Sequence, residues 1–435
     1  MPEILIASLS PLGHIAPLLN VAQGLVDRGD RVTVLSSADH AGKIRAVGAV
    51  PHAVPAEADF DVTRLDIDLP GRTETSGIKR VNFDLVPLFV QPMPHQTKVL
   101  SQLMAQTRFD AIIVDAGFFG ILPFLLGDRT ARPPGLAYTT TPLMITSRDT
   151  APSGTGLPPS STALGRLRNR AMTLLSQRVL LRQSQNAANY LLRHVNSRPL
   201  PTFILDSGLL ADRYIAPTVP EFDYPRSDLP AHVRYVSAVH PTPTSGFRLP
   251  PWWAELNGER PVVHVTQGTI DNADLGRLVE PTIAALGGED VIVMATTGGR
   301  DVSELKVALP MNTFVAEYIP HDLLLPKVDV MVTNGGYGAV QRALSMGVPL
   351  VVAVNTEDKP EVGARVAWTG AGINLRTGTP TPGAVRAAVR EVLGGNRYLG
   401  AARTLETAFA RRDGVAEIAA LVDEVIGERS AVVDR

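Results

Sequence analysis

The chain has 435 residues, 45% of them hydrophobic, and its 41 Lys and Arg side chains nearly balance 43 Asp and Glu, for a net charge of −2. This length predicts two domains of roughly 200 residues each, because single cores stop growing near that size. The charge balance gives no electrostatic reason to expect nucleic acid as a partner. The absence of cysteine excludes disulfides, thiolate metal sites and cysteine nucleophiles.

No targeting or membrane signal is visible in the sequence. The first residues, MPEILIASLSPLGH, begin with a strand-like run and not with the basic region and apolar core of a signal peptide. The longest apolar stretch, GFFGILPFLLG at 117–127, is too short to span a bilayer and contains Pro123. We therefore expect a cytoplasmic protein without a membrane span; nothing in the sequence indicates its oligomeric state.

The first half begins with a strand–helix–strand unit. Residues 4–9 form an apolar run that predicts a buried strand, and 17–26 carry apolar residues at helical spacing. Gly29 fits the end of that helix, and RVTVLSS at 31–37 predicts the next strand. A further short run, FDAIIVDAG at 109–117, contains Asp115 near its end. Such units build parallel sheets, and ligands bind at the carboxyl ends of their strands.

The same pattern restarts in the second half and predicts a second doubly wound sheet. Its expected strands are 261–269, 290–299, 329–336 and 349–358. We place an N-terminal Rossmann-like domain at 1–238, a Pro-, Ser- and Gly-rich linker at 239–258, a C-terminal Rossmann-like domain at 259–405 and terminal helices at 406–435. The irregular segments 56–82 and 147–163 are expected to be long surface loops, which often act as lids or binding loops.

Three glycine-rich turns follow strands of the second half. In VTNGGYGAVQRALSMGVP, 332–349, Gly335, Gly336 and Gly338 would let the backbone approach a ligand at the start of a helix, which is a site for phosphate. Similar turns occur at Gly268-Thr269 and at 297–299. Together they predict a nucleotide site, although each alone could be merely a tight turn.

His14 and Asp115 are the candidate catalytic pair. His14 is expected in the first strand-to-helix loop, where the helix N-terminus favours a neutral imidazole that can act as a general base. If the strand order is the usual one, Asp115 lies near that loop and could accept the Nδ1 proton. The alternatives are a structural histidine and an aspartate that caps its own turn.

Two segments are similar to a known enzyme family. Residues 317–375, from EYIPHDLLLPKVDVMVTNGGYG to GAGINL, resemble the donor-binding signature of inverting nucleotide-sugar-dependent glycosyltransferases, the UDP-glycosyltransferase superfamily with its bacterial antibiotic and macrolide enzymes. PLGHIAPLLNVAQGLVDRGDRVTVLSS resembles their N-terminal opening. The resemblance implies a GT-B fold, in which two Rossmann-like domains face each other across a cleft and C-terminal helices cross back to the first domain.

The resemblance also implies roles for individual residues. His14 would deprotonate the acceptor hydroxyl, with Asp115 orienting it. Tyr318 would stack on the nucleobase and Ile319 would offer its backbone, while Gly336 and its helix would hold the diphosphate. The other donor-site positions are Thr269 and Thr297 on turns that touch the nucleotide or phosphate, and Asp358, which matches an acidic residue that binds sugar hydroxyls.

Three positions depart from the family pattern. Asn334 stands where a phosphate-binding histidine is usual, and Arg342 where a ribose-binding glutamate is common. Lys359 replaces the usual glutamine after the aspartate. Because of these departures, both UDP-sugars and dTDP-sugars remain possible donors. We expect a UDP-sugar first.

The acceptor site has the weakest signal. The segments 85–95 and 138–149 are rich in Pro, Phe, Leu and Thr and would form an apolar wall with a few hydroxyls, suited to an antibiotic, polyketide or aromatic natural product. The wall would include Phe89, Phe118, Thr140 and Met144, for which ordinary core packing is the alternative. Biosynthetic decoration and antibiotic inactivation both fit such a site.

The expected reaction is one inverting displacement that needs neither a metal nor a resident cofactor, the nucleotide sugar being a co-substrate. The triplets DFD at 59–61 and DID at 66–68 imitate a manganese-binding motif, but such triplets arise by chance in acidic loops. The alternatives are a nucleotide-sugar epimerase and a noncatalytic nucleotide-sugar-binding protein of the same fold. An epimerase would need its acid and base in the donor half, whereas His14 lies in the other half.

Overall fold

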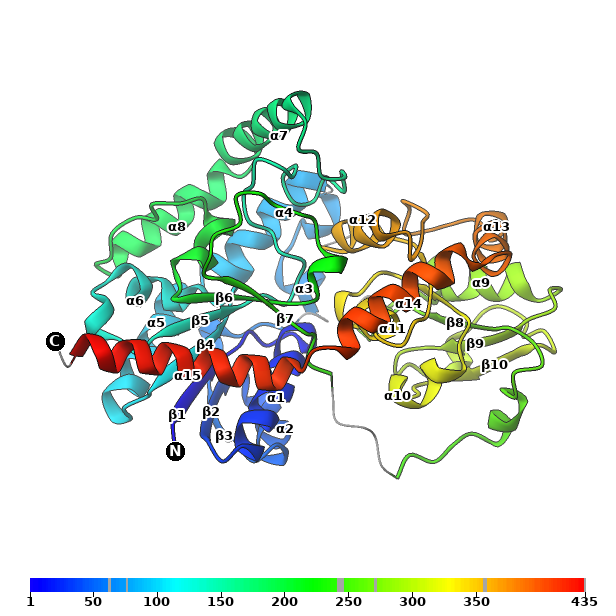
Figure 1. The fold of residues 1–435 in the computed structure, drawn as a ribbon, viewed down its shortest axis with the longest axis horizontal. Helices are drawn as coiled ribbons and strands as arrows, with labels where there is room; N and C mark the ends of the chain where they lie inside the picture. Colours follow the sequence, from blue (N-terminus) through cyan, green and yellow to red (C-terminus); the bar gives the residue numbers. More distant parts are fainter. Residues whose placement is uncertain (62–63, 76, 241–245, 270–271, 355–357, 434–435) are drawn as a thin grey trace.

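The computed structural model describes residues 1–61, 64–75, 77–240, 246–269, 272–354 and 358–433. The chain forms two α/β lobes, each built on a parallel sheet (Figure 1). The first strands of the N-terminal lobe lie at one side of the molecule and the second sheet lies at the other. This architecture confirms the predicted fold class of two Rossmann-like units.

The sheet of the N-terminal lobe has, in the described residues, the strand order β3-β2-β1-β4-β5-β6-β7, with every pair parallel. Ile4 and Ile6 of β1 face one core, which the helices α1 and α15 complete, and Leu5 and Ala7 face the other core, beside α5 and α6. Apolar residues on both faces are what a sheet covered on both sides requires. The strands are β1 (Glu3–Ala7), β2 (Arg31–Ser36), β3 (Val50–Ala53), β4 (Ala111–Asp115), β5 (Gly135–Tyr138), β6 (Arg213–Pro217) and β7 (Val233–Val236).

The first helix of this lobe starts earlier than the sequence predicts. It runs from Leu12 to Asp27 with Pro17 inside it, so His14 lies in its first turn and not in a loop. A proline inside a helix costs one backbone hydrogen bond, but Ile15, Leu18 and Leu19 bury their side chains around it and keep the helix continuous. The helices are α1 (Leu12–Asp27), α2 (Ala41–Ala46), α3 (Leu65–Asp68), α4 (Gly77–Leu85), α5 (Met93–Gln106), α6 (Leu122–Leu126), α7 (Ala163–Leu175) and α8 (Arg182–His194).

The sheet of the C-terminal lobe has the order β10-β9-β8-β11-β12-β13 in the described residues, also parallel throughout. This is the 3-2-1-4-5-6 order of dinucleotide-binding sheets, in which ligands bind where the order reverses, here between β8 and β11. The strands are β8 (Val262–Thr266), β9 (Ile292–Thr296), β10 (Thr313–Ala316), β11 (Val330–Thr333), β12 (Leu350–Val352) and β13 (Gly372–Asn374).

The C-terminal helices join the two lobes. Ala402, Leu405 and Phe409 of α14 pack in the core of the C-terminal lobe, and α15 packs against α1, β4 and β7 of the N-terminal lobe (Figure 1). The chain therefore crosses back at residues 411–413, so the expected boundary at 405 falls inside α14. The helices of this half are α9 (Val279–Leu286), α10 (His321–Leu324), α11 (Tyr337–Leu344), α12 (Lys359–Thr369), α13 (Pro382–Leu393), α14 (Asn396–Ala410) and α15 (Gly414–Val433).

The first crossing also differs from the expected linker at 239–258. Val219 and Phe222, which follow β6, already belong to the core of the C-terminal lobe. The chain then returns to the first sheet as β7 before it continues to Trp252 and Trp253, which pack against the second core. Residues 219–222 thus interlock the lobes ahead of the predicted boundary.

Candidate functional site

His14 and Asp115 meet at the carboxyl ends of two neighbouring strands. Asp115 is the last residue of β4, and His14 lies in the first turn of the helix that follows β1, the strand paired with β4. The Nδ1 atom of His14 lies 2.7 Å from Oδ2 of Asp115. The side chain of Asp115 is 1% exposed and that of His14 is 20% exposed, so a buried carboxylate holds an accessible imidazole. The structure therefore brings the two predicted catalytic residues together.

Asp115 has both roles that the sequence left open. Its Oδ1 accepts a hydrogen bond of 2.8 Å from the backbone N–H of Gly117, which caps the turn after β4. Its other oxygen faces His14. Because the turn fixes the carboxylate plane, the capping bond also orients the oxygen that meets the imidazole.

The predicted acceptor residues divide into two groups. Thr140 lies beside His14, with its Oγ1 3.0 Å from Nδ1 of the imidazole, and the centroid of the Phe89 ring lies 6.3 Å from that of His14. Met144 is partly exposed in the same connection as Thr140. Phe118 departs from the expectation: it is 1% exposed and packs in the core of the N-terminal lobe, so it offers no surface to an acceptor in this structure.

The glycine turn after β11 forms an open cradle at the start of α11. Gly335 has φ of +81°, and a Cβ there would lie 2.5 Å from Cγ1 of Val354, so conformation and packing both require glycine. A Cβ on Gly336 or Gly338 would meet no atom within 4 Å. The backbone of these two residues therefore borders open space at a helix N-terminus, as a phosphate site requires.

Asn334 binds within the protein at the same turn. Its Nδ2 donates a 2.6 Å hydrogen bond to the carbonyl of Gln267, which follows β8. Asn334 thereby joins the ends of β8 and β11, the two strands between which the sheet order reverses. The residue that departs from the family pattern thus holds the two turns together and keeps one amide hydrogen for another partner.

The two threonines of the neighbouring turns are not equivalent. Thr269 is exposed at the turn after β8. Thr297 differs from the expectation of a ligand contact, because its side chain is buried and its hydroxyl donates to the carbonyl of Arg300 in its own turn. The Asn272 amide also binds the backbone carbonyl of Thr297, at 3.0 Å. These bonds give Thr297 a structural role in shaping the turn.

In the segment expected to hold the nucleobase, the Tyr318 ring is exposed and the next residue, Ile319, is buried. Tyr318 is 58% exposed, whereas Ile319 is 2% exposed and anchors the segment in the core. Burial is the main cause of the lowered pKa of His321, about 4, and the nearby guanidinium of Arg342 on α11 also lowers it. Arg342 is therefore directed toward the segment after β10.

Asp358 and Lys359 stand at the start of α12, directly after residues outside the described set. Asp358 occupies the N-cap position and is half-buried, and Lys359 is buried at the first helical position. Asp358 contributes to the raised pKa of the buried Tyr337, whose main cause is burial. The two predicted sugar-binding residues thus lie near the start of α11.

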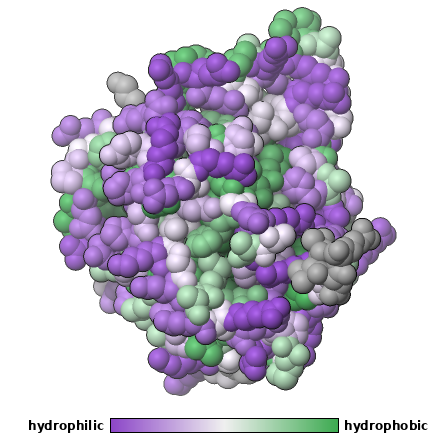
Figure 2. Space-filling view, turned by 90° about the vertical axis from the view of Figure 1, so that its left-hand side faces the viewer, coloured by the Kyte–Doolittle hydropathy of each residue, from purple (hydrophilic) through white to green (hydrophobic). Residues whose placement is uncertain are grey.

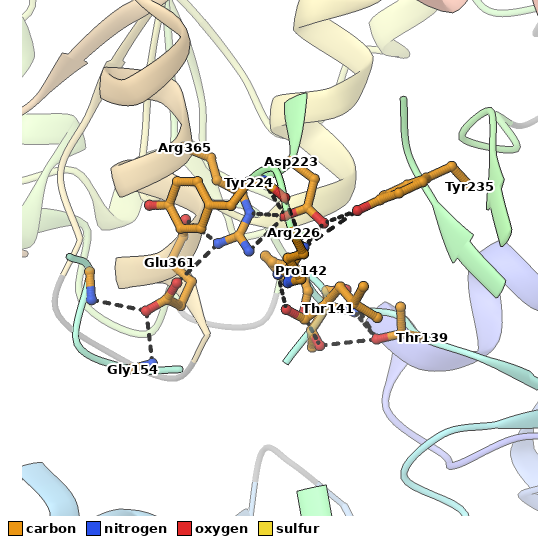
Figure 3. A network of polar contacts seen from close by, with 12 residues as sticks. Thr139, Thr141, Pro142, Gly154, Asp223, Tyr224, Arg226, Tyr235, Glu361 and Arg365 are labelled. Atoms are coloured by element: carbon orange, nitrogen blue, oxygen red, sulfur yellow. Dashed lines mark hydrogen bonds and ion pairs between the residues drawn. The ribbon is translucent and has the colours of Figure 1, made fainter. Parts of the chain in front are cut away.

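Sequence reasoning missed a buried ion-pair network that joins the lobes (Figure 3). Asp223, after β6, pairs with Arg365 of α12 at 2.8 Å and with Arg226 at 2.7 Å, and Tyr235 donates to it at 2.8 Å. Burial alone would raise the pKa of Asp223, but Arg365 and Arg226 outweigh that effect and hold it at about 2. Asp223 is therefore ionised and joins an arginine of each lobe.

The network reaches two parts of the connection between β5 and α7 in the N-terminal lobe. On one side, Glu361 pairs with Arg365 at 3.0 Å and accepts hydrogen bonds from the backbone N–H groups of Gly154 and Gly156, at 2.8 and 2.9 Å (Figure 3). This contact holds the expected loop 147–163 against α12. On the other side, Arg226 donates to the carbonyl of Leu143 at 3.0 Å, in the connection that carries Thr140.

Among the described residues, no group of three His, Asp or Glu side chains lies close enough together to hold a metal ion. In the acidic triplets, Asp59 accepts a hydrogen bond from Ser10, and Asp68 pairs with Arg64 at 3.3 Å. In the part of the chain that the structure describes, no helix is both long and apolar enough to cross a membrane.

Known proteins match this chain along nearly its full length. Residues 280–425 match the family model of the erythromycin biosynthesis protein CIII-like C-terminal domain. The chain is 39% identical over 427 residues to the 4'-demethylrebeccamycin synthase of Lentzea aerocolonigenes, covering 98% of this chain and 99% of that protein. It is 34% identical over 437 residues to UDP-glycosyltransferase 2 of Phaeomoniella chlamydospora, covering 98% and 96%.

Solved structures agree on the fold. The spinosyn rhamnosyltransferase SpnG complexed with thymidine diphosphate superposes with a TM-score of 0.68 at 17% identity, over 97% of this chain and 100% of that chain. Together with the full-length relatives, this places the chain: it belongs to the antibiotic- and macrolide-type glycosyltransferases of the UDP-glycosyltransferase superfamily, and it is a glycosyltransferase of the GT-B fold.

Proposed function

We propose that this glycosyltransferase moves a sugar from a UDP- or dTDP-sugar to a hydroxyl of a small apolar natural product, with inversion at the anomeric carbon and His14 as the general base. The observation that carries the proposal is the 2.7 Å contact between Nδ1 of His14 and the buried carboxylate of Asp115. With Nδ1 bound to Asp115, Nε2 is the ring nitrogen that takes a substrate proton.

The reaction is one displacement. Nε2 of His14 accepts the proton of the acceptor hydroxyl while the hydroxyl oxygen forms a bond to the anomeric carbon. The bond from that carbon to the diphosphate oxygen breaks, and the diphosphate leaves with its electron pair. The positive charge that forms on His14 lies against Asp115, and the charge on the diphosphate would be stabilised by the amides of the open glycine turn and the N-terminus of α11.

The donor assignment rests on the C-terminal lobe. The open space at Gly336 and Gly338 supports a diphosphate, and the exposed Tyr318 supports a stacked base. One relative is named a UDP-glycosyltransferase, and one structural neighbour is complexed with thymidine diphosphate. UDP- and dTDP-sugars are therefore the donors to test first.

The acceptor assignment rests on Phe89 and Thr140 beside His14, and on the partly exposed Met144 in the connection that carries Thr140. The first relative is named for 4'-demethylrebeccamycin, and the structural neighbour is a spinosyn rhamnosyltransferase. Both names support a natural-product acceptor. A base in the N-terminal lobe favours transfer over epimerisation, which would act within the donor lobe.

The first experiment measures thermal unfolding with UDP, dTDP, GDP and ADP. A nucleotide at a hundredfold over its dissociation constant stabilises the native state by about 2.7 kcal/mol. A shift with UDP or dTDP identifies the donor series, and the absence of a shift with any nucleotide contradicts the donor assignment.

The second experiment measures transfer by His14→Ala, with the exposed His95→Ala as the matched control. We expect transfer to be lost only in the first variant, with nucleotide binding kept in both. Unchanged transfer would refute the assigned base. Proton NMR of the product tests inversion, since an α-linked donor must give a β-glycoside. Loss of transfer after addition of a chelator would contradict the metal-independent displacement.

A further inference from the structure

The helical projection α7–α8 carries an unusual charge. Between Asp149 and Asp206 the sequence contains no Asp, Glu or Lys but has seven arginines, in a chain whose net charge is −2. Arg170, Arg178 and Arg182 are exposed. Because every charge of this stretch has the same sign, its surface attracts anionic partners.

The apolar side of α7 faces away from the protein. The buried residues of α7 are Gly165 and Asn169, and the π-helix η8 (Ser176–Leu180) that continues it buries Ser176. Five large apolar residues are exposed at helical spacing: Leu164 (81% exposed), Leu167 (64%), Leu174 (47%), Leu175 (52%) and Val179 (63%). We call these five residues the leucine face. An ordinary surface helix has the opposite arrangement, with its apolar stripe toward the core.

The α7 end of the projection lies at the edge of the molecule, whereas α8 packs against α5 and buries Ala188 and Leu192 in the core of the N-terminal lobe. In Figure 1, α7 forms the top of the molecule. At the same end of the molecule, Figure 2 shows hydrophobic residues mixed with hydrophilic ones. A hollow of about 480 Å³ lies beside the leucine face, lined by Arg148, Arg166 and Arg170 together with hydroxyls and Leu167 and Leu174. Arg166 pairs with Asp149 at 2.8 Å, so Arg148 and Arg170 supply the net positive charge beside Leu167 and Leu174.

We propose that the leucine face and its surrounding arginines bind the surface of an anionic lipid bilayer. The leucines would enter the boundary between headgroups and acyl chains, and the arginines would bind lipid phosphates, as in amphipathic helices that lie in the interface. With 13 residues, α7 is about 20 Å long, which is too short to cross the bilayer. Such docking would keep an apolar acceptor and the enzyme at the same surface.

A second copy of the chain fits the leucine face less well. The usual symmetric dimer places the same patch of both subunits in contact. The arginines of one α7–α8 projection would then oppose those of the other, without a carboxylate from that stretch between them. Charge complementarity therefore favours anionic lipid over self-association.

The test is flotation of the full chain with vesicles of phosphatidylcholine alone or mixed with phosphatidylglycerol. We expect binding only to the mixed vesicles, weakened by salt. The triple variant Arg170→Gln/Arg178→Gln/Arg182→Gln should bind about a hundredfold more weakly, since each arginine near an anionic surface contributes roughly fivefold. The double variant Leu167→Glu/Leu174→Glu should not bind.

Matched controls separate this surface from general effects of charge and hydrophobicity. Leu309→Glu/Leu399→Glu changes two exposed leucines of the other lobe, and Arg45→Gln/Arg397→Gln/Arg411→Gln changes three exposed arginines elsewhere. Both control variants should bind like the original chain. Circular dichroism of all variants should be unchanged, because every substituted side chain is exposed.

Three results would overturn the proposal. The first is no binding to phosphatidylglycerol vesicles, and the second is equal binding by the α7–α8 variants and their controls. The third comes from analytical ultracentrifugation: a dimer that Leu167→Glu/Leu174→Glu converts to a monomer would assign the leucine face to self-association.

Discussion

Replacing Arg365 with Met should destabilise the contact between the lobes. The methionine keeps a flexible apolar stem but removes the guanidinium group. The Arg365 side chain is 2% exposed, and its guanidinium pairs with Asp223 at 2.8 Å and with Glu361 at 3.0 Å. It also removes the contact with the Tyr224 ring, whose centroid lies 4.2 Å from Cζ of Arg365. Breaking a buried ion pair by removing one partner costs about 3–5 kcal/mol.

The lower end of that range is expected for Arg365→Met. Asp223 keeps its ion pair with Arg226 and the hydrogen bond from Tyr235, so its charge is not left alone. The matched control is Arg390→Met, which removes the partner of Glu289 at 2.8 Å on the surface, where the arginine side chain is 65% exposed. An exposed pair contributes about 0–1 kcal/mol. The difference between the variants should therefore be about 2–3 kcal/mol.

Urea unfolding followed by tryptophan fluorescence measures this difference, with Trp368 as a nearby probe because it packs edge-on against Tyr224. Two lobes need not unfold together, so the transition that changes in Arg365→Met is the one to compare. Equal free energies of unfolding for Arg365→Met and Arg390→Met would refute the inference that the buried network stabilises the contact between the lobes.

The same network predicts a dependence of stability on pH. The pKa of Asp223 is lowered from 3.8 to about 2 in the folded chain, so its contribution is complete above 3.8 and is lost as the pH falls toward 2. That shift corresponds to about 2 kcal/mol. Asp223→Asn should therefore be less stable than the original chain at pH 7, with the difference shrinking below pH 3.8. A difference that does not change with pH would contradict the assigned charge.

Three further predictions concern the site. Asp115→Asn should lower kcat about a hundredfold or more with nucleotide binding unchanged, because His14 loses its buried carboxylate; a rate near the original one would contradict the pairing. Thr140→Val should lower kcat/KM by about fivefold, the loss of one hydrogen bond, and an unchanged pH profile would argue against its contact with the imidazole. Gly335→Ala should abolish nucleotide binding measured by calorimetry. Its φ of +81° and the 2.5 Å distance between the added Cβ and Val354 would force the turn to move. The added Cβ of Gly338→Ala meets no atom within 4 Å, so that variant should fold normally.

The parts of the fold that the sequence predicted are those with a local pattern. Short apolar runs ending in polar or glycine-rich turns identified β1, β2, β4, β8, β9, β11 and β12. The strands that were missed are β3, β5, β6, β7, β10 and β13. Most of these are short, and β6 ends in Pro217, so their strand character depends on pairing with neighbours that the sequence does not reveal.

The contact between His14 and Asp115 was predictable although the residues are 101 positions apart. Parallel sheets of the usual order place the first and fourth strands side by side, and their carboxyl ends then meet at one edge. The position of His14 within α1 was not predictable in the same way, because Pro17 is typical of a first helical position and suggested a later start.

The ion-pair network had no comparable sequence signal. Glu361 and Arg365 are four residues apart, a spacing that usually indicates an exposed pair on a helix, and Asp223 lies 142 residues from Arg365. Residues 219–222 pack into the core of the C-terminal lobe, and this packing brings Asp223 to the pair formed by Glu361 and Arg365. Arg226, paired with the same aspartate, also donates to the carbonyl of Leu143, three positions from Thr140, which lies beside His14. One buried carboxylate therefore links the loop beside His14 to the helix that begins at Lys359, and the position of His14 relative to that helix depends on a residue that is assigned to neither the catalytic pair nor the donor site.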